Sequence, residues 1–289
     1  MTSFQRRQAL LPYLLLAPGL LWLAAFFAVP LYYMARISLE QGTIYTGYHF
    51  AWHFQTYADS ISAYQTQIIR SFLYAGAATG IALAVGYPLA YAIAFRGGKW
   101  KTALLLLVIV PFFVTYLIRT LSWETILDDD GLVVNTLQTV GILSGNGRLL
   151  ATTAAVIAGI TYNFLPFMIL PLYASLERID PRMLEAGYDL YGTRRAVFTR
   201  VTLPLSAPGV VAGVLLTFIP AAGDFINAEL LGTPRQAMIG NVIQSRYLEL
   251  TDYPTAAALS FVLMAAILVT VLIWARVAGT ESLLGSEAR

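Results

Sequence analysis

The sequence predicts an all-α membrane protein that crosses the bilayer six times. Of its 289 residues, 58% are hydrophobic and 12% are charged, whereas a soluble domain is about 25% charged. A membrane-spanning helix needs about 20 mostly apolar residues, and six such runs occur, at 12–34, 69–95, 102–121, 149–172, 205–222 and 255–275. Strands of a membrane barrel would alternate apolar and polar residues, which these runs do not. We therefore treat residues 1–289 as a single transmembrane domain.

The first run resembles a secretory signal, and the second run contains a pair of glycines. The first follows Arg6 and Arg7 and so looks like a secretory signal. It is longer than the about 7–15 apolar residues of a cleavable signal, so we expect it to remain as a span. In the second run, Gly76 and Gly80 lie four residues apart. This spacing allows close helix packing, although it also arises by chance in a chain rich in Gly and Ala.

The later runs carry prolines and a second glycine pair. Prolines lie within or at the ends of the second to fourth runs, at Pro88, Pro111, Pro166 and Pro171. A proline inside a span frees backbone groups that neighbouring helices, side chains or water must satisfy, so we expect kinked helices around a cavity. Gly209 and Gly213 repeat the close-packing spacing in the fifth run.

The basic residues predict the orientation of the chain, because Lys and Arg near the ends of spans concentrate on the cytoplasmic side. With the N-terminus inside, the inner segments carry 12 of the 18 Lys and Arg residues and the outer segments carry the other six. Both termini, and the segment at residues 177–203, are therefore predicted to be cytoplasmic.

No metal or catalytic site is predicted. The chain has no Cys, and its two histidines, His49 and His53, both lie in the first loop. Two histidines four apart on a helix can bind zinc, but no third ligand is evident. A membrane-embedded enzyme would need a nucleophile with its base, or a metal cluster, and the sequence offers neither.

Residues 177–203 are the longest polar stretch on the predicted inner side. Asp180 followed by proline predicts a helix start, because the carboxylate accepts free N–H groups and proline suits the first position. Gly192 interrupts this helix, Thr193 caps a second short helix, and Pro204 is expected to open the fifth span. The prediction is a helix–turn–helix across the membrane face. An amphipathic linker resting on lipid is the alternative.

This segment resembles the EAA loop of permease subunits in type I ABC importers. The family pattern is Glu-Ala-Ala, then Gly, then an apolar residue shortly before Leu-Pro. The matching positions are Glu185, Ala186, Gly187, Gly192, Val201, Leu203 and Pro204. Two departures occur, since Gly187 replaces the third-position Ala, and Tyr191 takes the usual Gly position with Gly192 one residue later. Because the spacing from Glu to Leu-Pro is retained, we expect a shifted turn.

The resemblance extends over nearly the whole chain and is closest to the spermidine/putrescine-type branch. Its further matching stretches are residues 14–19, 86–91, 116–120, 162–180, 223–225 and 230–241. It implies the six-span type I permease fold in a bacterial cytoplasmic membrane, with a cytoplasmic coupling helix between spans 4 and 5. The implied function is to form half of the pathway for a small polar solute, with a polyamine favoured and an opine, thiamine, iron or sulfate as alternatives.

The resemblance also implies partners. These are a cytoplasmic ABC ATPase dimer, a second permease subunit in a heterodimer, an extracellular or periplasmic solute-binding protein and the lipid bilayer, with no nucleic acid. The implied ATPase-coupling residues are Glu185, Ala186, Gly187, Tyr188, Asp189, Leu190, Tyr191, Gly192, Thr193 and Arg194.

The chain itself is expected to be neither an enzyme nor a cofactor-binding protein. No Gly-x-x-x-x-Gly-Lys-Ser/Thr loop occurs in the sequence, so ATP and Mg are expected on the partner ATPase. An ion-coupled secondary transporter is the less favoured reading, because no convincing internal repeat is present.

Five residues are candidates for the substrate pathway: Glu124 beside Trp123, Asp224 at the outer end of the fifth span, and Tyr162 with Asn163 inside the fourth span. A carboxylate beside an aromatic ring attracts an ammonium group through both its charge and the ring. The outer segments carry ten Asp and Glu residues against six Arg, so their net charge is negative. A negative outer face would concentrate a cation. The preference of basic residues for the inner side also explains this negative charge by itself. Structural roles are the alternative, with Arg119 pairing with Glu124 or Asp224, and Asn163 bonding a neighbouring helix.

Overall fold

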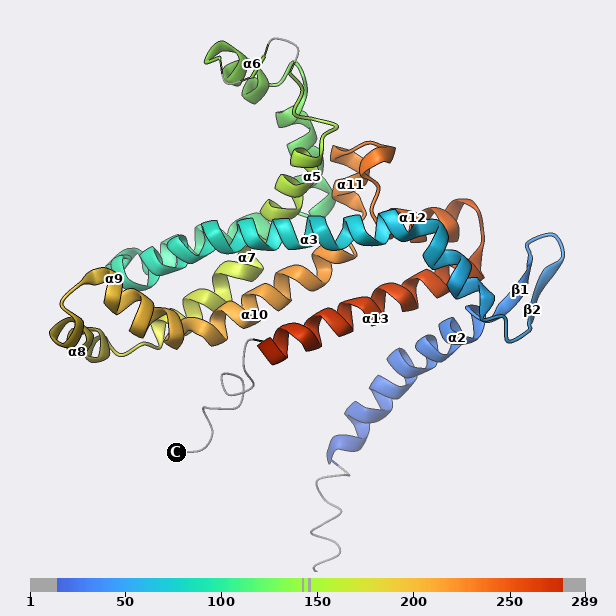
Figure 1. Cartoon of the computed structure of the whole chain (residues 1–289), viewed down its shortest axis with the longest axis horizontal. Coiled ribbons are helices and arrows are strands. Elements are labelled where there is room, and N and C mark those ends of the chain that lie inside the picture. Colours follow the sequence, from blue (N-terminus) through green and yellow to red (C-terminus); the bar gives the residue numbers. More distant parts are fainter. Residues whose placement is uncertain (1–14, 142, 145–146, 278–289) are drawn as a thin grey trace, which may run out of the picture. The chain divides into compact units, whose positions relative to one another are not determined.

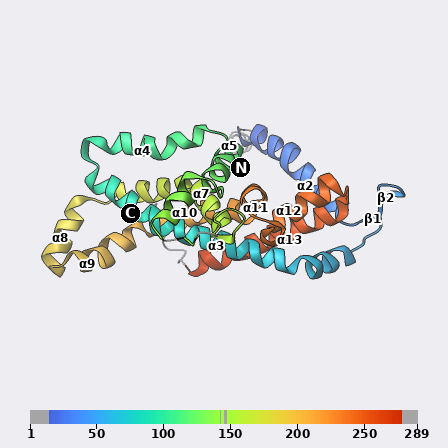
Figure 2. The same cartoon turned by 90° about the horizontal axis from the view of Figure 1, so that it is seen from above.

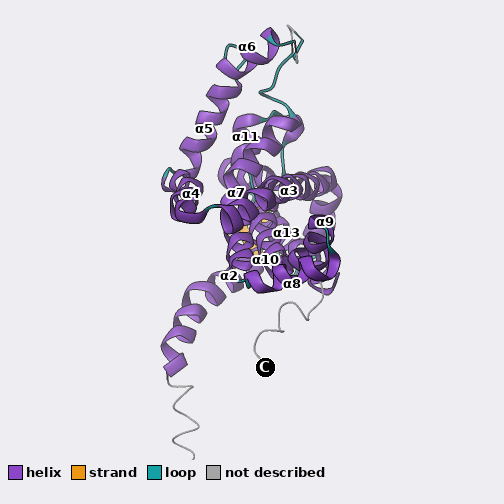
Figure 3. Cartoon of the chain, turned by 90° about the vertical axis from the view of Figure 1, so that its left-hand side faces the viewer, coloured by secondary structure: helices purple, strands orange, loops and turns teal. Residues whose placement is uncertain are grey.

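The structure is a computed structural model that describes residues 15–141, 143–144 and 147–277. Most of the described chain is helical (Figures 1 and 3). The chain divides into two compact units, one of residues 1–63 and 243–262 and the other of residues 64–242 and 263–289. The first three residues of the first predicted span, together with Arg6, Arg7 and Arg289, lie outside the described residues.

Five described helices are long and apolar enough to cross a membrane, at residues 15–37, 55–96, 153–177, 194–222 and 253–276. The two segments 98–113 and 116–127 pass the same test together but are bent by 95° to one another. Counting that pair as one broken span gives six.

The third predicted span, residues 102–121, is therefore not one straight helix. Helix α4 (Lys101–Ile109) tightens into a 3₁₀ turn that contains Pro111, and Val114 and Thr115 are extended, with ψ of 135° and 146°. Proline lacks a backbone N–H and crowds the preceding turn, which accounts for the break before α5 (Tyr116–Leu127).

The first unit contains the first span, residues 15–37, and a β-hairpin. Helix α2 (Val29–Ile37) is followed by strands β1 (Glu40–Thr43) and β2 (Gly47–Phe50), which pair antiparallel with Glu40 opposite Phe50. Within this unit the Tyr48 hydroxyl donates a 2.5 Å hydrogen bond to the Thr251 carbonyl. The hairpin is thereby tied to the loop before α13 (Tyr253–Val277).

The second unit begins at a kink in the long helix α3 (Gln55–Arg96), where Tyr64 departs from helical geometry at φ −116° and ψ 18°. Its remaining elements follow in order: α4, α5, α6 (Leu132–Thr139), α7 (Thr153–Glu177), α8 (Pro181–Tyr191), α9 (Arg194–Val197), α10 (Leu203–Ala222), α11 (Ile226–Leu231), the start of α12 (Ile239–Gln244) and the part of α13 from Leu263 onward. Helices α3, α7 and α10 run side by side (Figures 1 and 2).

The two predicted glycine pairs behave differently. A Cβ added at Gly209 would lie 2.5 Å from the Ser175 Cβ and 2.7 Å from the Pro171 carbonyl oxygen, and one at Gly213 would lie 2.8 Å from the Met168 sulfur. These glycines let α10 approach α7 closely, as predicted. At Gly76 and Gly80 a Cβ would meet nothing within 4 Å among the described residues, so the close packing predicted there is not found.

Candidate functional site

The polar segment between α7 and α10 folds as a helix, a tight turn and a second helix. The Asp180 side chain accepts a 2.9 Å hydrogen bond from the Arg182 N–H, with proline at the first position of α8. Gly192 adopts φ +67° and ends α8, and the Thr193 hydroxyl accepts a 3.3 Å bond from the Ala196 N–H. Left-handed geometry suits glycine, so the turn falls where the shifted Gly192 predicts it.

The second helix differs from the prediction because it has no break at Pro204. Residues 194–222 form one continuous helix of 29 residues. A π-helical turn at Phe198–Thr202 lies just before the proline, and there the Leu203 N–H bonds to the Phe198 carbonyl. A π turn locally widens the helix, so it accommodates Pro204. As predicted, Pro204 lies in the first turn of α10 (Leu203–Ala222), but α9 passes into α10 through the π turn without a break.

Close packing on α9 accounts for the glycine that replaces the usual alanine. Gly187 is the buried residue of α8. A Cβ at this position would lie 3.2 Å from Val201 and 3.4 Å from Val197, which is tight for any side chain. Glycine therefore lets α8 lie against the following helix.

The outward face of α8 combines charge with uncovered apolar groups. Glu185, Ala186 and Asp189 are exposed, and the side chain of Leu190 is 77% exposed. Tyr191 is anchored by the Arg200 guanidinium, which lies 5.0 Å from the centre of its ring. A capped, anchored helix with such a surface is suited to contact with a protein partner.

Two of the predicted pathway residues, Asn163 and Asp224, belong to one buried polar network (the Asp224 network: Tyr116, Thr120, Asn163, Asp224 and Asn227). The Tyr116 hydroxyl donates to the Asp224 carboxylate at 2.7 Å. The Asn227 amide donates to Tyr116 and Asp224 at 2.5 Å each, and the Asn163 amide donates to Thr120 at 3.1 Å and Asn227 at 3.2 Å. The network joins α5, α7, α11 and the turn after α10.

Burial governs the electrostatics of this network. Burial raises the pKa of the Asp224 carboxyl, while hydrogen bonds from Asn227 and Tyr116 act in the opposite direction. Gly159 makes room for the network, since a Cβ there would lie 2.4 Å from Leu231 and 2.6 Å from the Asn227 side-chain oxygen. The hydrogen bond from the Asn163 amide to Thr120 on α5 confirms the alternative in which Asn163 bonds a neighbouring helix.

The other candidates lie on α5 and α7 beside this network. The rings of Trp123 and Tyr162 meet edge to face with centroids 5.4 Å apart, and Glu124 is half-buried. Among the described residues no ion pair joins Arg119 to Glu124 or Asp224, so the pairing considered for Arg119 is not found. The substrate role of all five candidates stays a prediction.

The sequence reading missed Tyr116, Thr120 and Asn227. Asn227 follows Asp224 by three residues, and its N–H donates to that carboxylate at 3.2 Å, a local spacing that could have indicated it. Tyr116 lies 108 residues from Asp224, and no local signal links them.

The fold described here defines a multi-pass membrane permease, and comparison with known proteins agrees. Residues 82–278 match the family described as binding-protein-dependent transport system inner membrane component. The chain belongs to this family and is a permease subunit of a type I ABC importer, embedded in the inner membrane.

Two relatives carry the same name. The chain is 38% identical to the spermidine/putrescine transport system permease protein PotB of Haemophilus influenzae over 240 residues, which cover 83% of this chain and 84% of that protein. It is 38% identical to PotB of Escherichia coli over 196 residues, which cover 68% and 71%. A solved bacterial alginate ABC transporter, in complex with an alginate pentasaccharide-bound periplasmic protein, contains a chain that aligns with a TM-score of 0.68 at 21% identity, covering 96% of each chain. At that identity the likeness shows the fold alone.

Proposed function

We propose that this chain forms half of the translocation pathway of a polyamine importer. The observation that carries the proposal is the similarity to PotB, at 38% identity over 83% of the chain. Residues able to attract an ammonium group, among them Glu124 beside Trp123, add support. An importer of another small solute is the alternative, and a molybdenum permease relative at 27% identity keeps it open.

The energy is supplied by ATP and Mg bound to a separate ATPase dimer. Helix α8 seats in a cleft of that ATPase, and Glu185 forms an ion pair with an ATPase arginine. Since residues 194–222 are one helix, a movement imposed on the α8–α9 turn reaches α10 without a hinge. The close contact of Gly209 and Gly213 with α7 passes the movement on to α7, so access alternates between the two sides of the membrane.

The remaining partners follow from the same assembly. A second, different permease subunit completes the pathway, and a periplasmic or extracellular solute-binding protein delivers the substrate. Both chain ends lie in the cytoplasm, which agrees with the excess of basic residues on the predicted inner side.

Uptake by the reconstituted complex tests the substrate. The full chain, its sister permease and the ATPase are placed in liposomes that contain ATP, and radiolabelled spermidine or putrescine is added with the cognate binding protein. We expect ATP-dependent accumulation that unlabelled polyamine competes away and that thiamine, sulfate and molybdate do not. Accumulation of one of those solutes in place of polyamine would reject the polyamine assignment and leave the permease assignment intact.

A further inference from the structure

An ion pair between Lys101 and Glu177 joins two spans of the second unit. The Lys101 ammonium donates to both carboxylate oxygens of Glu177, at 2.9 and 2.8 Å. Lys101 is the first residue of α4, and Glu177 is the last residue of α7. The pair therefore connects the start of the third span to the end of the fourth, between residues that lie 76 positions apart in the chain.

Each of the two charges lies at the helix end that does not favour it. A helix carries a partial positive charge at its N-terminal end and a partial negative charge at its C-terminal end. The Lys101 ammonium lies at the positive end of α4, and the Glu177 carboxylate lies at the negative end of α7. The stability of each helix alone favours the opposite charge, so it is the bond between the helices that favours these two residues.

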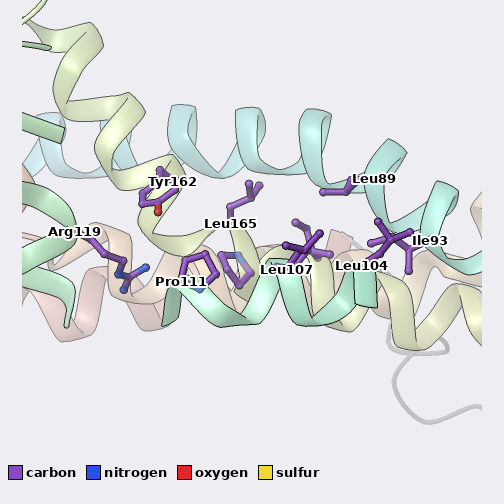
Figure 4. Close-up of a pocket in the computed structure, with 11 residues that line it drawn as sticks. Leu89, Ile93, Leu104, Leu107, Pro111, Arg119, Tyr162 and Leu165 are labelled. Carbon is purple, nitrogen blue, oxygen red and sulfur yellow. The ribbon is translucent and has the colours of Figure 1, made fainter. Parts of the chain in front are cut away.

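Helix α4 has little apolar packing of its own in this unit. None of its residues is buried, and Leu107 is 70% exposed. An apolar groove of about 330 Å³ lies beside it, and Leu104 and Leu107 line this groove together with Leu89 and Ile93 of α3 and Leu165 of α7 (Figure 4). Because apolar contacts hold α4 weakly, the ion pair at its start has a large part in fixing its position.

The end of α7 is joined closely to α8. Residues 178–180 alone separate Glu177 from α8. Ile179 is 7% exposed and belongs with Leu176 to a buried cluster, against which Leu184 of α8 packs. The end of α7 and the start of α8 thus form one packed corner. A displacement of α8 is passed to Glu177 and, through the ion pair, to Lys101.

The other end of α4 leads to the Asp224 network. The chain continues through the 3₁₀ turn and the bend into α5, whose first residue, Tyr116, donates to the Asp224 carboxylate at 2.7 Å. One turn later, Thr120 accepts a 3.1 Å hydrogen bond from the Asn163 amide. A shift of α4 therefore acts on a network that contains two of the substrate-pathway candidates.

We propose that Lys101 and Glu177 are positioning residues that couple α8 to the third span, beside the connection through the continuous helix 194–222. Helix α8 is then attached at both ends, through the turn at Gly192 to α9 and α10, and through the ion pair to α4. This role rests on the proposed contact of α8 with the ATPase. Both side chains are partly exposed, and such ion pairs add little to folding stability. Loss of the pair should therefore change coupling and leave folding intact.

Exchange of the two charges tests the link in proteoliposomes that contain the full chain, its sister permease and the ATPase. We expect Lys101→Gln and Glu177→Gln each to lower spermidine uptake per ATP hydrolysed several-fold, with unchanged thermal unfolding. The double variant Lys101→Glu/Glu177→Lys rebuilds the pair with each charge at the helix end that favours it, and should regain most of the lost uptake. Lys99→Gln is the matched control, because it removes an exposed positive charge two residues away.

The same measurement on Glu185→Ala separates this role from the ATPase contact. Wild-type coupling in both single variants, in a complex that Glu185→Ala does uncouple, would overturn the link and leave the contact of α8 with the ATPase intact. Wild-type coupling in all three variants would reject that contact as well. An exchanged pair that regains no uptake would also overturn the link, because each charge would then act by itself.

A reversible crosslink tests whether the two helix ends stay together through the transport cycle. The chain contains no Cys, so Lys101→Cys with Glu177→Cys introduces its only two thiols. Bridging them with a short bis-methanethiosulfonate reagent should raise uptake per ATP hydrolysed several-fold over the unbridged double variant, and reduction should reverse the gain. Uptake that the bridge blocks or leaves unchanged would overturn the proposal, since the pair would then have to open during transport or would carry no movement.

Discussion

At the scale of single residues, Glu185 is the charged group best placed to connect the chain to an ATPase. It is exposed on α8, one turn before Asp189 on a helix capped at both ends. We expect Glu185→Ala to uncouple the complex, so that ATP-driven uptake falls at least ten-fold while the chain still inserts and the ATPase still hydrolyses ATP. Uptake and phosphate release are measured on the same proteoliposomes. Glu229→Ala, an exposed acid on α11, is the control, and wild-type uptake by the Glu185 variant would contradict the coupling role.

Asn227 holds the Asp224 network together, because its amide group bonds three other side chains of that network. Replacing it by alanine removes one hydrogen bond each from Tyr116, Asp224 and Asn163. We expect Asn227→Ala to lower the free energy of unfolding by about 1–3 kcal/mol, because each buried hydrogen bond contributes about 0.5–1.5 kcal/mol. Unfolding in mixed micelles measures the change. Asn135→Ala on α6, where the amide is exposed, should change stability by less, and an equal loss in both variants would argue against a structural network.

At the scale of elements, the contact between α7 and α10 depends on glycine at position 209. An alanine methyl there would meet the Ser175 Cβ and a backbone carbonyl, neither of which can rotate away. We expect Gly209→Ala to destabilise the protein by about 1–3 kcal/mol through overpacking. Gly76→Ala should be neutral, or stabilising by about 0.5–1 kcal/mol through reduced backbone freedom, since its Cβ meets nothing. Thermal unfolding in detergent compares the two, and similar losses would contradict this assignment of the interface.

The elements that could be predicted from the sequence are those set by local chemistry. The caps at Asp180 and Thr193 and the turn at Gly192 each depend on atoms within three or four residues. The local sequence is therefore enough to predict them. The bend between segments 98–113 and 116–127 was missed because residues 102–121 form one run that is long and apolar enough for a straight span. Continuity through Pro204 depends on a π turn, which has no simple residue signature. The β-hairpin was missed because Glu40–Thr43 and Gly47–Phe50 are short and lack alternating hydrophobic residues.

The candidate site also has one part that could be predicted from the sequence and one part that could not. The α8 surface could be predicted because one continuous motif encodes it, whereas the Asp224 network brings together residues far apart in the chain. Arg119 was considered as a partner for Glu124 or Asp224 because a sequence shows which residues are charged. It does not show which of them lie close together in the fold. The structure instead places the Arg119 guanidinium near the rings of Phe112 and Tyr116, in the lining of an apolar groove.

At the scale of the whole molecule, transport requires that force applied at the α8–α9 turn reach the membrane-spanning helices. The continuous helix 194–222 provides this connection, and its π turn at Phe198–Thr202 is the place to interrupt it. Two double variants at Thr199 and Arg200 remove the same side chains, one replacing both residues with glycine and the other with alanine. Glycine lowers helix stability by about 1 kcal/mol per residue relative to alanine, so only the glycine variant loosens the backbone.

We expect the glycine pair to reduce ATP-driven uptake several-fold below that of the alanine pair, while both variants bind the ATPase equally in pull-down measurements. The difference isolates backbone rigidity, because loss of the Arg200 contact with Tyr191 is common to both. Equal uptake by the two variants would show that movement passes from α8 to the spans by another route. In that case the direct packing of Gly187 against Val197 and Val201 would be the next contact to test, because it is the other path by which α8 touches this helix.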